Sequence, residues 1–239
     1  MKVHQRRQNL QKWNLAVDED WSDTVRGTGL AHLQHCMYEQ HNVALINAMI
    51  ERWAPETNTF KMPFGAMTIT LHDAHYLLGL PIDGAAVVPG RSSGHQVYED
   101  LALALGMTDK ERKTEEMGRR GFKCQWLIDR ANDSQLRRHN PAAVATAFLL
   151  YLLCSTLFPD KSNDRLPIAL LGLLEQHDRV GSFSWGGAAV CTLYRRLGEA
   201  TWTECRAITG CMTLLEVCFT RNCLFSCVII SDIQFVGRE

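Results

Sequence analysis

The sequence predicts a mainly α-helical protein, a single helical domain with one short β-hairpin near residues 58–71. Apolar side chains recur at three- and four-residue spacing and predict a helix that ends before Pro55: Ile46, Met49, Ile50 and Trp53. The segments 59–62 and 67–70 are rich in β-branched and apolar residues, and the Pro/Gly-containing stretch 63–66 between them predicts the turn. Internal repeats, low-complexity tracts and long linkers are absent from the sequence, which favours one domain.

A second short helix is predicted directly after the hairpin. Thr70 and Asp73 have the spacing of a capping box, and apolar turns follow over residues 71–78 (with His75 among the apolar positions). Gly79 suits the left-handed conformation that ends a helix, Leu80 is placed to pack back on the last turn, and Pro81 prevents continuation.

The most apolar stretch, residues 142–158, has two interpretations. It is apolar over about 17 residues, which is the lower limit for crossing a bilayer. Pro141 precedes it and Pro159 ends it, an arrangement typical of a buried helix with firm ends. We therefore predict a core helix and no membrane association.

The rest of the chain predicts short helices joined by compact loops. The predicted helices cover residues 97–105, 166–176 and 188–197, and a last one opens at residues 203–206. Residues 109–120 are strongly charged and predicted to be solvated, residues 122–128 hold an apolar set, and residues 137–141 are predicted to be a basic linker.

Composition and charge set wide bounds on function. The 239 residues include 25 basic and 26 acidic side chains, so the net charge of −1 provides no global field that would attract nucleic acid. Nine cysteines are an odd number and a poor disulfide framework, and residues 1–20 have no apolar signal-peptide core. These features predict reduced thiols and an intracellular protein.

Several stretches in the same order resemble the plant mobile domain family, also labelled aminotransferase-like. They are ERWAPETNTF and MTITLHDAHYLLGLPIDG, then FLLYLLCSTLFPDKSNDRLPIALL, and then LLEQHDRVGSFSWGGAAVCTLYRRLGEAT. The resemblance implies a polar N-terminal extension over residues 1–29, the domain over 30–217 and a divergent tail over 218–239. Because the family continues with a tryptophan-rich helix where this chain reads CFTRNCLFSCVIISDIQFVGRE, we expect a C-terminally truncated domain.

The resemblance also implies a function. It points to a plant nuclear protein similar to maintenance-of-meristems proteins, acting in transposon silencing, gene-expression regulation and meristem maintenance, with protein partners that include a phosphatase-like nuclear protein. Two alternatives stay open: a cofactor-binding, aminotransferase-like enzyme, and a transposon-derived remnant without a cellular role.

The sequence contains no clear cluster of reactive groups. We therefore predict no catalytic, cofactor-binding or metal-binding residues and no cofactor, and we expect that the protein is not an enzyme. His32-x-x-His35-Cys36 and His72-x-x-His75 lack a second pair at metal-site spacing. The glycine-containing loop 89–95 lacks the Walker pattern, and the lysines lie in polar contexts without a cofactor motif. The C-terminal cysteines are crowded but form no C-x-x-C pair: Cys205, Cys211, Cys218, Cys223 and Cys227.

Four pairs of basic residues are the sequence feature that could support nucleic-acid binding, provided that the fold brings them into one groove: Arg6-Arg7, Arg119-Arg120, Arg137-Arg138 and Arg195-Arg196. Their sequence context is that of solvated faces, with acidic residues nearby. The aromatic side chains sit on apolar faces and are predicted to be core anchors: Trp53, Trp126, Phe148, Tyr151, Trp185 and Tyr194.

Overall fold

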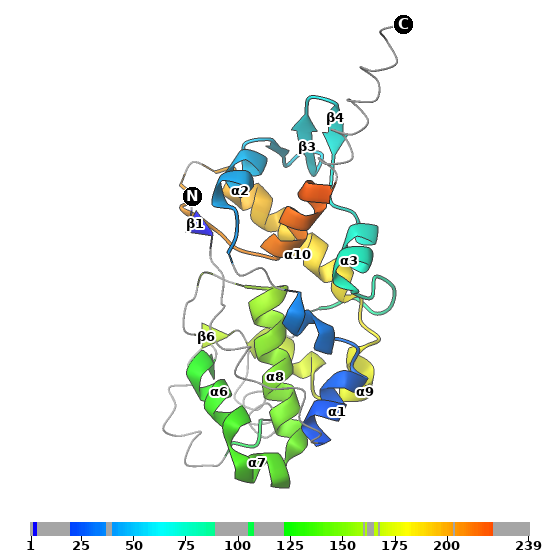
Figure 1. Cartoon of the computed structure of the whole chain (residues 1–239), viewed down its shortest axis with the longest axis vertical. Coiled ribbons are helices and arrows are strands. Elements are labelled where there is room, and N and C mark those ends of the chain that lie inside the picture. Colours follow the sequence, from blue (N-terminus) through cyan, green and yellow to red (C-terminus); the bar gives the residue numbers. More distant parts are fainter. Residues whose placement is uncertain are drawn as a thin grey trace, which may run out of the picture.

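The computed structural model of the chain describes residues 2–3, 20–36, 40–88, 105–107, 122–159, 161, 165–166, 168–202 and 204–221, and in these ranges it is mainly α-helical (Figure 1). The helices are α1 (Asp20–Gly27), the 3-10 helix η2 (Ala31–His35), α2 (Val43–Ile50), α3 (Leu71–Leu78), α6 (Cys124–Asn132), α7 (Ser134–His139), α8 (Pro141–Thr156), the 3-10 helix η3 (Ile168–Leu173), α9 (His177–Val180), α10 (Trp185–Ala200) and a last helix over residues 212–221. The strands are β1 (Lys2–Val3), β2 (Trp53–Ala54), β3 (Thr59–Met62), β4 (Gly65–Met67), β5 (Phe122–Lys123), β6 (Arg165–Leu166) and β7 (Ala207–Ile208). The predicted fold class is confirmed.

Helix α8 is the central element of one half of the molecule. Every residue from Ala143 to Thr156 is buried, so the helix is covered on all sides, and Figure 1 shows α1, α6 and α7 around it. Asn140 caps its start by accepting a hydrogen bond from the backbone N–H of Ala143 at 3.1 Å, with Pro141 in the first turn. The prediction of a core helix is confirmed. In the described part of the chain, no helix has the length and apolar character that crossing a membrane requires.

The other half is built around α10 and the last helix. Side chains from Cys211 to Phe219 are buried, apart from a half-buried Val217. The Phe219 ring meets the Phe60 ring edge-on at a centroid distance of 4.7 Å, so this helix lies under strand β3. Cys218 and Phe219, assigned to the divergent tail in the sequence, therefore belong to the core.

The predicted hairpin is present, with a third strand added. Its second strand lies earlier than the predicted residues 67–70, because Met62 pairs with Gly65 and β4 therefore covers residues 65–67. β3 pairs antiparallel with β4, with Phe60 opposite Met67 and Met62 opposite Gly65, so that residues 63–64 form the turn. β2 pairs with the other edge of β3, placing Trp53 opposite Phe60. The prediction that Trp53 extends the preceding helix is therefore wrong, because α2 ends at Ile50 and the Trp53 ring packs on Phe60 at 4.6 Å.

The ends of α3 follow the sequence prediction closely. Thr70 accepts a hydrogen bond from the backbone N–H of Asp73, and the Asp73 carboxylate accepts one from the backbone N–H of Thr70, which completes the capping box. Gly79 is left-handed with a φ of 62°, and Leu80 behind it is fully buried. His75, predicted on the apolar face, is exposed instead.

Several other boundaries differ from the sequence predictions. Residues 137–141 are the end of α7 and the start of α8 rather than a linker, because Asp133 and Asn140 cap two successive helices. The helix predicted over residues 166–176 is the shorter η3, and α10 begins at Trp185, ahead of its predicted start. The helix predicted to open at residues 203–206 does not form over the described residues 204–206, since β7 follows them and the last helix begins at residue 212. The predictions for residues 97–104 and 109–120 lie outside the described residues.

Helix α1 falls within the stretch expected to be a polar extension, yet it contributes to the core. Trp21 is 1% exposed, Val25 is fully buried, and the Trp21 ring lies 5.7 Å from the Phe148 ring of α8. The sequence did not predict this helix, because Trp21 and Val25 are its only large apolar residues and its remaining side chains are small, polar or charged.

Candidate functional site

Two loops that are distant in the sequence are joined to each other by hydrogen bonds. One follows α3 (residues 79–85) and the other leads into α10 (residues 181–186); we call this contact the loop junction. The backbone N–H of Ala85 donates to Ser182 O at 3.0 Å, that of Ser184 donates to Ala85 O at 2.8 Å, and that of Gly186 donates to Pro81 O at 2.8 Å. The Ser184 hydroxyl donates to Ile82 O at 2.7 Å. Polar groups of both loops are thereby used within the domain.

Glycines make the close approach of the two loops possible. Gly84 has a φ of +108°, and a Cβ built on it would lie 2.2 Å from Ser182 O, a backbone atom. A Cβ on Gly186 would lie 2.8 Å from the Ile82 side chain and 3.1 Å from Pro81 O. These two positions lie in the stretches LLGLPIDG and SFSWGG, so the loop junction explains why glycine stands there.

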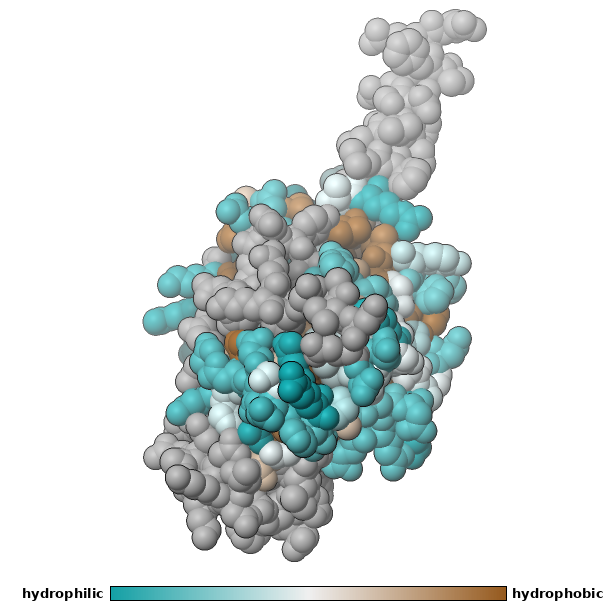
Figure 2. Space-filling model, turned by 60° about the horizontal axis from the view of Figure 1, so that its bottom comes forward, coloured by the Kyte–Doolittle hydropathy of each residue, from teal (hydrophilic) through white to brown (hydrophobic). Residues whose placement is uncertain are grey.

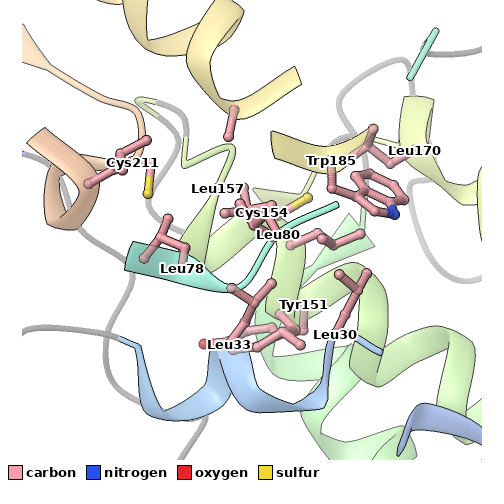
Figure 3. Packing of buried hydrophobic residues seen from close by; sticks show 14 of the residues in the cluster. Leu30, Leu33, Leu78, Leu80, Tyr151, Cys154, Leu157, Leu170, Trp185 and Cys211 are labelled. Carbon is pink, nitrogen blue, oxygen red and sulfur yellow. The ribbon is translucent and has the colours of Figure 1, made fainter. Parts of the chain in front are cut away.

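Trp185 fixes the junction to the core. Its ring is fully buried, and its indole N–H donates to Val180 O at 2.8 Å, which satisfies the one polar group of the side chain. Figure 3 shows Trp185 in one apolar cluster with Leu80 from the first loop and with Tyr151 and Cys154 of α8. The loop junction therefore connects α3, α10 and the central helix.

Three of the four histidines considered as metal ligands make contacts within the domain: His32, His72 and His75. His32 Nε2 lies 2.7 Å from Leu78 O, a carbonyl left open at the end of α3, and the ring fills the space above Gly79. His75 Nδ1 lies 3.0 Å from Leu80 O, and the His72 ring stacks on Tyr76 at 6.2 Å. Within the described ranges, no group of three or more His, Cys, Asp or Glu side chains is arranged to hold a metal ion.

The cysteines near this region are poor nucleophiles. The pKa of the Cys211 thiol is raised to about 12, chiefly by burial and to a small extent by the nearby Cys36, while a hydrogen bond with the backbone of Leu214 opposes the rise. Burial also raises the pKa of Cys36. Because the thiolate is the reactive form, these side chains act as small apolar groups at neutral pH. Cys223 and Cys227 lie outside the described residues.

The structure does not bring the described basic pairs into one groove. Arg137 and Arg138 lie on α7 at the bottom of Figure 1, whereas Arg195 and Arg196 lie on α10 in the upper half. The guanidinium of Arg137 lies 5.5 Å from the Trp21 ring and serves packing. Arg6-Arg7 and Arg119-Arg120 are outside the described residues, as is the loop over residues 89–95.

Four of the six predicted aromatic anchors are confirmed as core residues. Trp53, Phe148, Tyr151 and Trp185 are each at most 5% exposed, whereas Trp126 and Tyr194 are half-buried. Tyr194 holds the sheet to α10: its hydroxyl lies 2.8 Å from the Thr68 hydroxyl and also donates to Ile69 O.

Lys61 and Lys161, two of the lysines considered as possible cofactor ligands, are exposed.

One buried polar contact was not predicted from the sequence. The Glu216 carboxylate of the last helix lies 2.6 Å from His41 Nδ1, and both side chains are at most 7% exposed. The same carboxylate accepts a hydrogen bond from the backbone N–H of Asn42, the residue that caps α2. The two halves of this contact are separated by 175 positions, so no local pattern could reveal it.

These features define a helical scaffold whose recognisable motifs are used in packing and capping, and comparison with known proteins identifies its family. The plant mobile domain model matches residues 29–220, and the chain belongs to this family. The chain is 34% identical over 214 residues to the protein MAIN-LIKE 1 of Arabidopsis thaliana, covering 87% of this chain and 40% of that protein. It is 34% identical over 182 residues to the Arabidopsis protein MAINTENANCE OF MERISTEMS, covering 73% of this chain and 36% of that protein.

A third Arabidopsis relative is a serine/threonine-protein phosphatase 7 long form homolog, 34% identical over 196 residues, with 79% of this chain and 14% of that protein covered. The chain thus spans less than half the length of these curated relatives. No solved structure matches.

Proposed function

We propose that this chain is a non-catalytic interaction module of the plant nucleus, acting through partner proteins in transposon silencing, gene-expression regulation and meristem maintenance. The observation that carries the proposal is the loop junction. The hydroxyl of Ser184, the indole N–H of Trp185 and the ring of His32 all bond to groups of the domain itself. Side chains committed in this way hold a scaffold in shape, which is what a binding surface requires.

The relatives support a modular role. The matched region makes up 40% of one relative and 14% of another, so the same domain stands in proteins of very different length. One relative is named as a phosphatase homolog and another for the maintenance of meristems. We extend both names to this chain as a proposal: its partners include a phosphatase-like nuclear protein, and its role lies in gene regulation in growing tissue.

Affinity purification of the tagged chain from plant nuclei, with mass spectrometry of what it retains, tests the proposal. A matched control is the Gly84→Val variant, in which the larger side chain meets Ser182 O and disrupts the loop junction. We expect the native chain to retain a phosphatase-like protein or chromatin proteins that the variant loses. Recovery of chaperones alone from both would contradict the proposal and favour the remnant without a cellular role. A cofactor absorbance band in the purified chain would contradict the non-catalytic assignment.

A further inference from the structure

Helix α10 has a buried face and an exposed stripe. Leu193 and Leu197 are fully buried, whereas Cys191, Arg195 and Trp202 are exposed. Cys191 and Arg195 are four residues apart, which places them on one side of α10, and Trp202 lies two residues beyond the end of the helix. The chain continues as a turn after Ala200, with the backbone N–H of Trp202 donating to Glu199 O at 3.3 Å. We call this surface, made of Cys191, Arg195, Glu199 and Trp202, the α10 stripe.

Positive charge gathers beside the α10 stripe. Arg196 Nη1 lies 2.8 Å from the Glu199 carboxylate in a partly exposed ion pair. The hydrogen bond from Arg196 lowers the pKa of Glu199 most, and the charges of Arg196, Arg195 and Lys161 lower it further. Lys161 follows α8 in the sequence, so the fold brings a third cation to this place. Among the described residues, these three cations around one carboxylate make a local excess of positive charge on a chain whose net charge is −1.

The exposed tryptophan adds an apolar anchor to this charge. Trp202 is 71% exposed although an indole ring is one of the largest apolar surfaces a protein can bury. Tryptophan and arginine are the residues that most often dominate the binding energy of protein interfaces. On the α10 stripe, Arg195 lies on α10, whose buried face fixes its position, and Trp202 lies in the turn that follows, held by its backbone hydrogen bond to Glu199 O.

We propose that the α10 stripe docks an acidic protein segment that also carries an apolar side chain. The inference rests on the proposed interaction function and deepens it by naming the surface and the chemistry of the partner. Arg195 and Lys161 attract the carboxylates, and Trp202 covers the apolar side chain. Nucleic acid fits this surface less well, because duplex binding draws on roughly six to ten phosphate contacts, whereas one of the three cations here is already paired with Glu199.

The test is the affinity of the purified chain for a labelled short peptide of glutamates with one central phenylalanine, measured by fluorescence anisotropy at low salt. We expect Arg195→Glu and Trp202→Ala each to weaken binding by about tenfold or more. Matched controls lie elsewhere on the surface: Arg138→Glu on α7, which is exposed, and Tyr76→Ala on α3, which is 72% exposed. Neither control should change the affinity.

The inference would be overturned if the two control variants lost as much affinity for the peptide as Arg195→Glu and Trp202→Ala. It would also be overturned if the native chain did not bind the peptide. Binding of an oligonucleotide of matched charge, but not of the peptide, would overturn it in favour of nucleic acid. The nuclear purification separates this inference from the proposed function. If the Arg195→Glu variant retained the same phosphatase-like or chromatin proteins, the α10 stripe would not be the docking surface, and the proposed function would still stand. Their absence from the native chain would overturn the proposed function itself.

Discussion

Replacing Gly84 by alanine tests the loop junction at its tightest point. The added Cβ would lie 2.2 Å from Ser182 O, so one loop must move away from the other. A positive φ of 108° costs a non-glycine residue about 1 kcal/mol or more. The move also breaks two backbone hydrogen bonds, from Ala85 to Ser182 O and from Ser184 to Ala85 O, worth about 1 kcal/mol each. We expect the free energy of unfolding to fall by about 3 kcal/mol in total.

Urea unfolding of the purified chain, followed by far-UV circular dichroism, measures this loss. The matched control is Gly27→Ala at the end of α1, where a Cβ would meet nothing within 4 Å. Its stability should stay the same or rise by up to about 1 kcal/mol, because alanine reduces the freedom of the unfolded chain. If Gly84→Ala and Gly27→Ala unfold at the same urea concentration, Gly84 is not held against Ser182 and the reasoning fails.

Three further predictions address buried groups. Glu216→Ala should lower the free energy of unfolding by about 3 kcal/mol or more in the same urea assay, because it leaves the buried His41 ring and the partly buried backbone N–H of Asn42 without an acceptor. A loss no larger than that of the exposed control Glu175→Ala would contradict this. Burial lowers the pKa of His177 below its ordinary value of 6.5, so the unfolded chain binds more protons and stability should fall as the pH drops below that value. His177→Gln should weaken this pH dependence, and an identical slope in both proteins would refute the assignment. Alkylation mapped by mass spectrometry should modify exposed Cys191 well before buried Cys211, and the reverse order would contradict the placement of both thiols.

The sequence predicted best those features that depend on neighbouring residues. The capping box of Thr70 and Asp73 and the left-handed Gly79 are local, and all appear as expected. The buried helix α8 could also be predicted, because a long apolar run between prolines has few other solutions.

Features that depend on distant partners were missed. Trp53 satisfies a helical spacing, yet its ring contacts with Phe60 and Tyr194 draw it into a strand. The contact between His41 and Glu216 has no sequence signature. The stretches that became the loop junction were recognised separately, but nothing in either one shows that Gly84 would lie against Ser182. Contacts between surface residues are equally hard to predict. Hydrophilic residues cover much of the described surface in the view of Figure 2, and local sequence does not indicate which of them lie together.

Amide hydrogen exchange at Ala85, Ser184 and Gly186 tests the central claim, that the two recognisable loops form one structural junction. Their N–H groups donate to Ser182 O, Ala85 O and Pro81 O across the junction. If these bonds belong to the stable core, the three amides should exchange only as the whole domain unfolds, at rates similar to those of buried amides in α8. Exchange as fast as in exposed turns would show that the loops open independently, and would contradict the scaffold on which the proposed function depends.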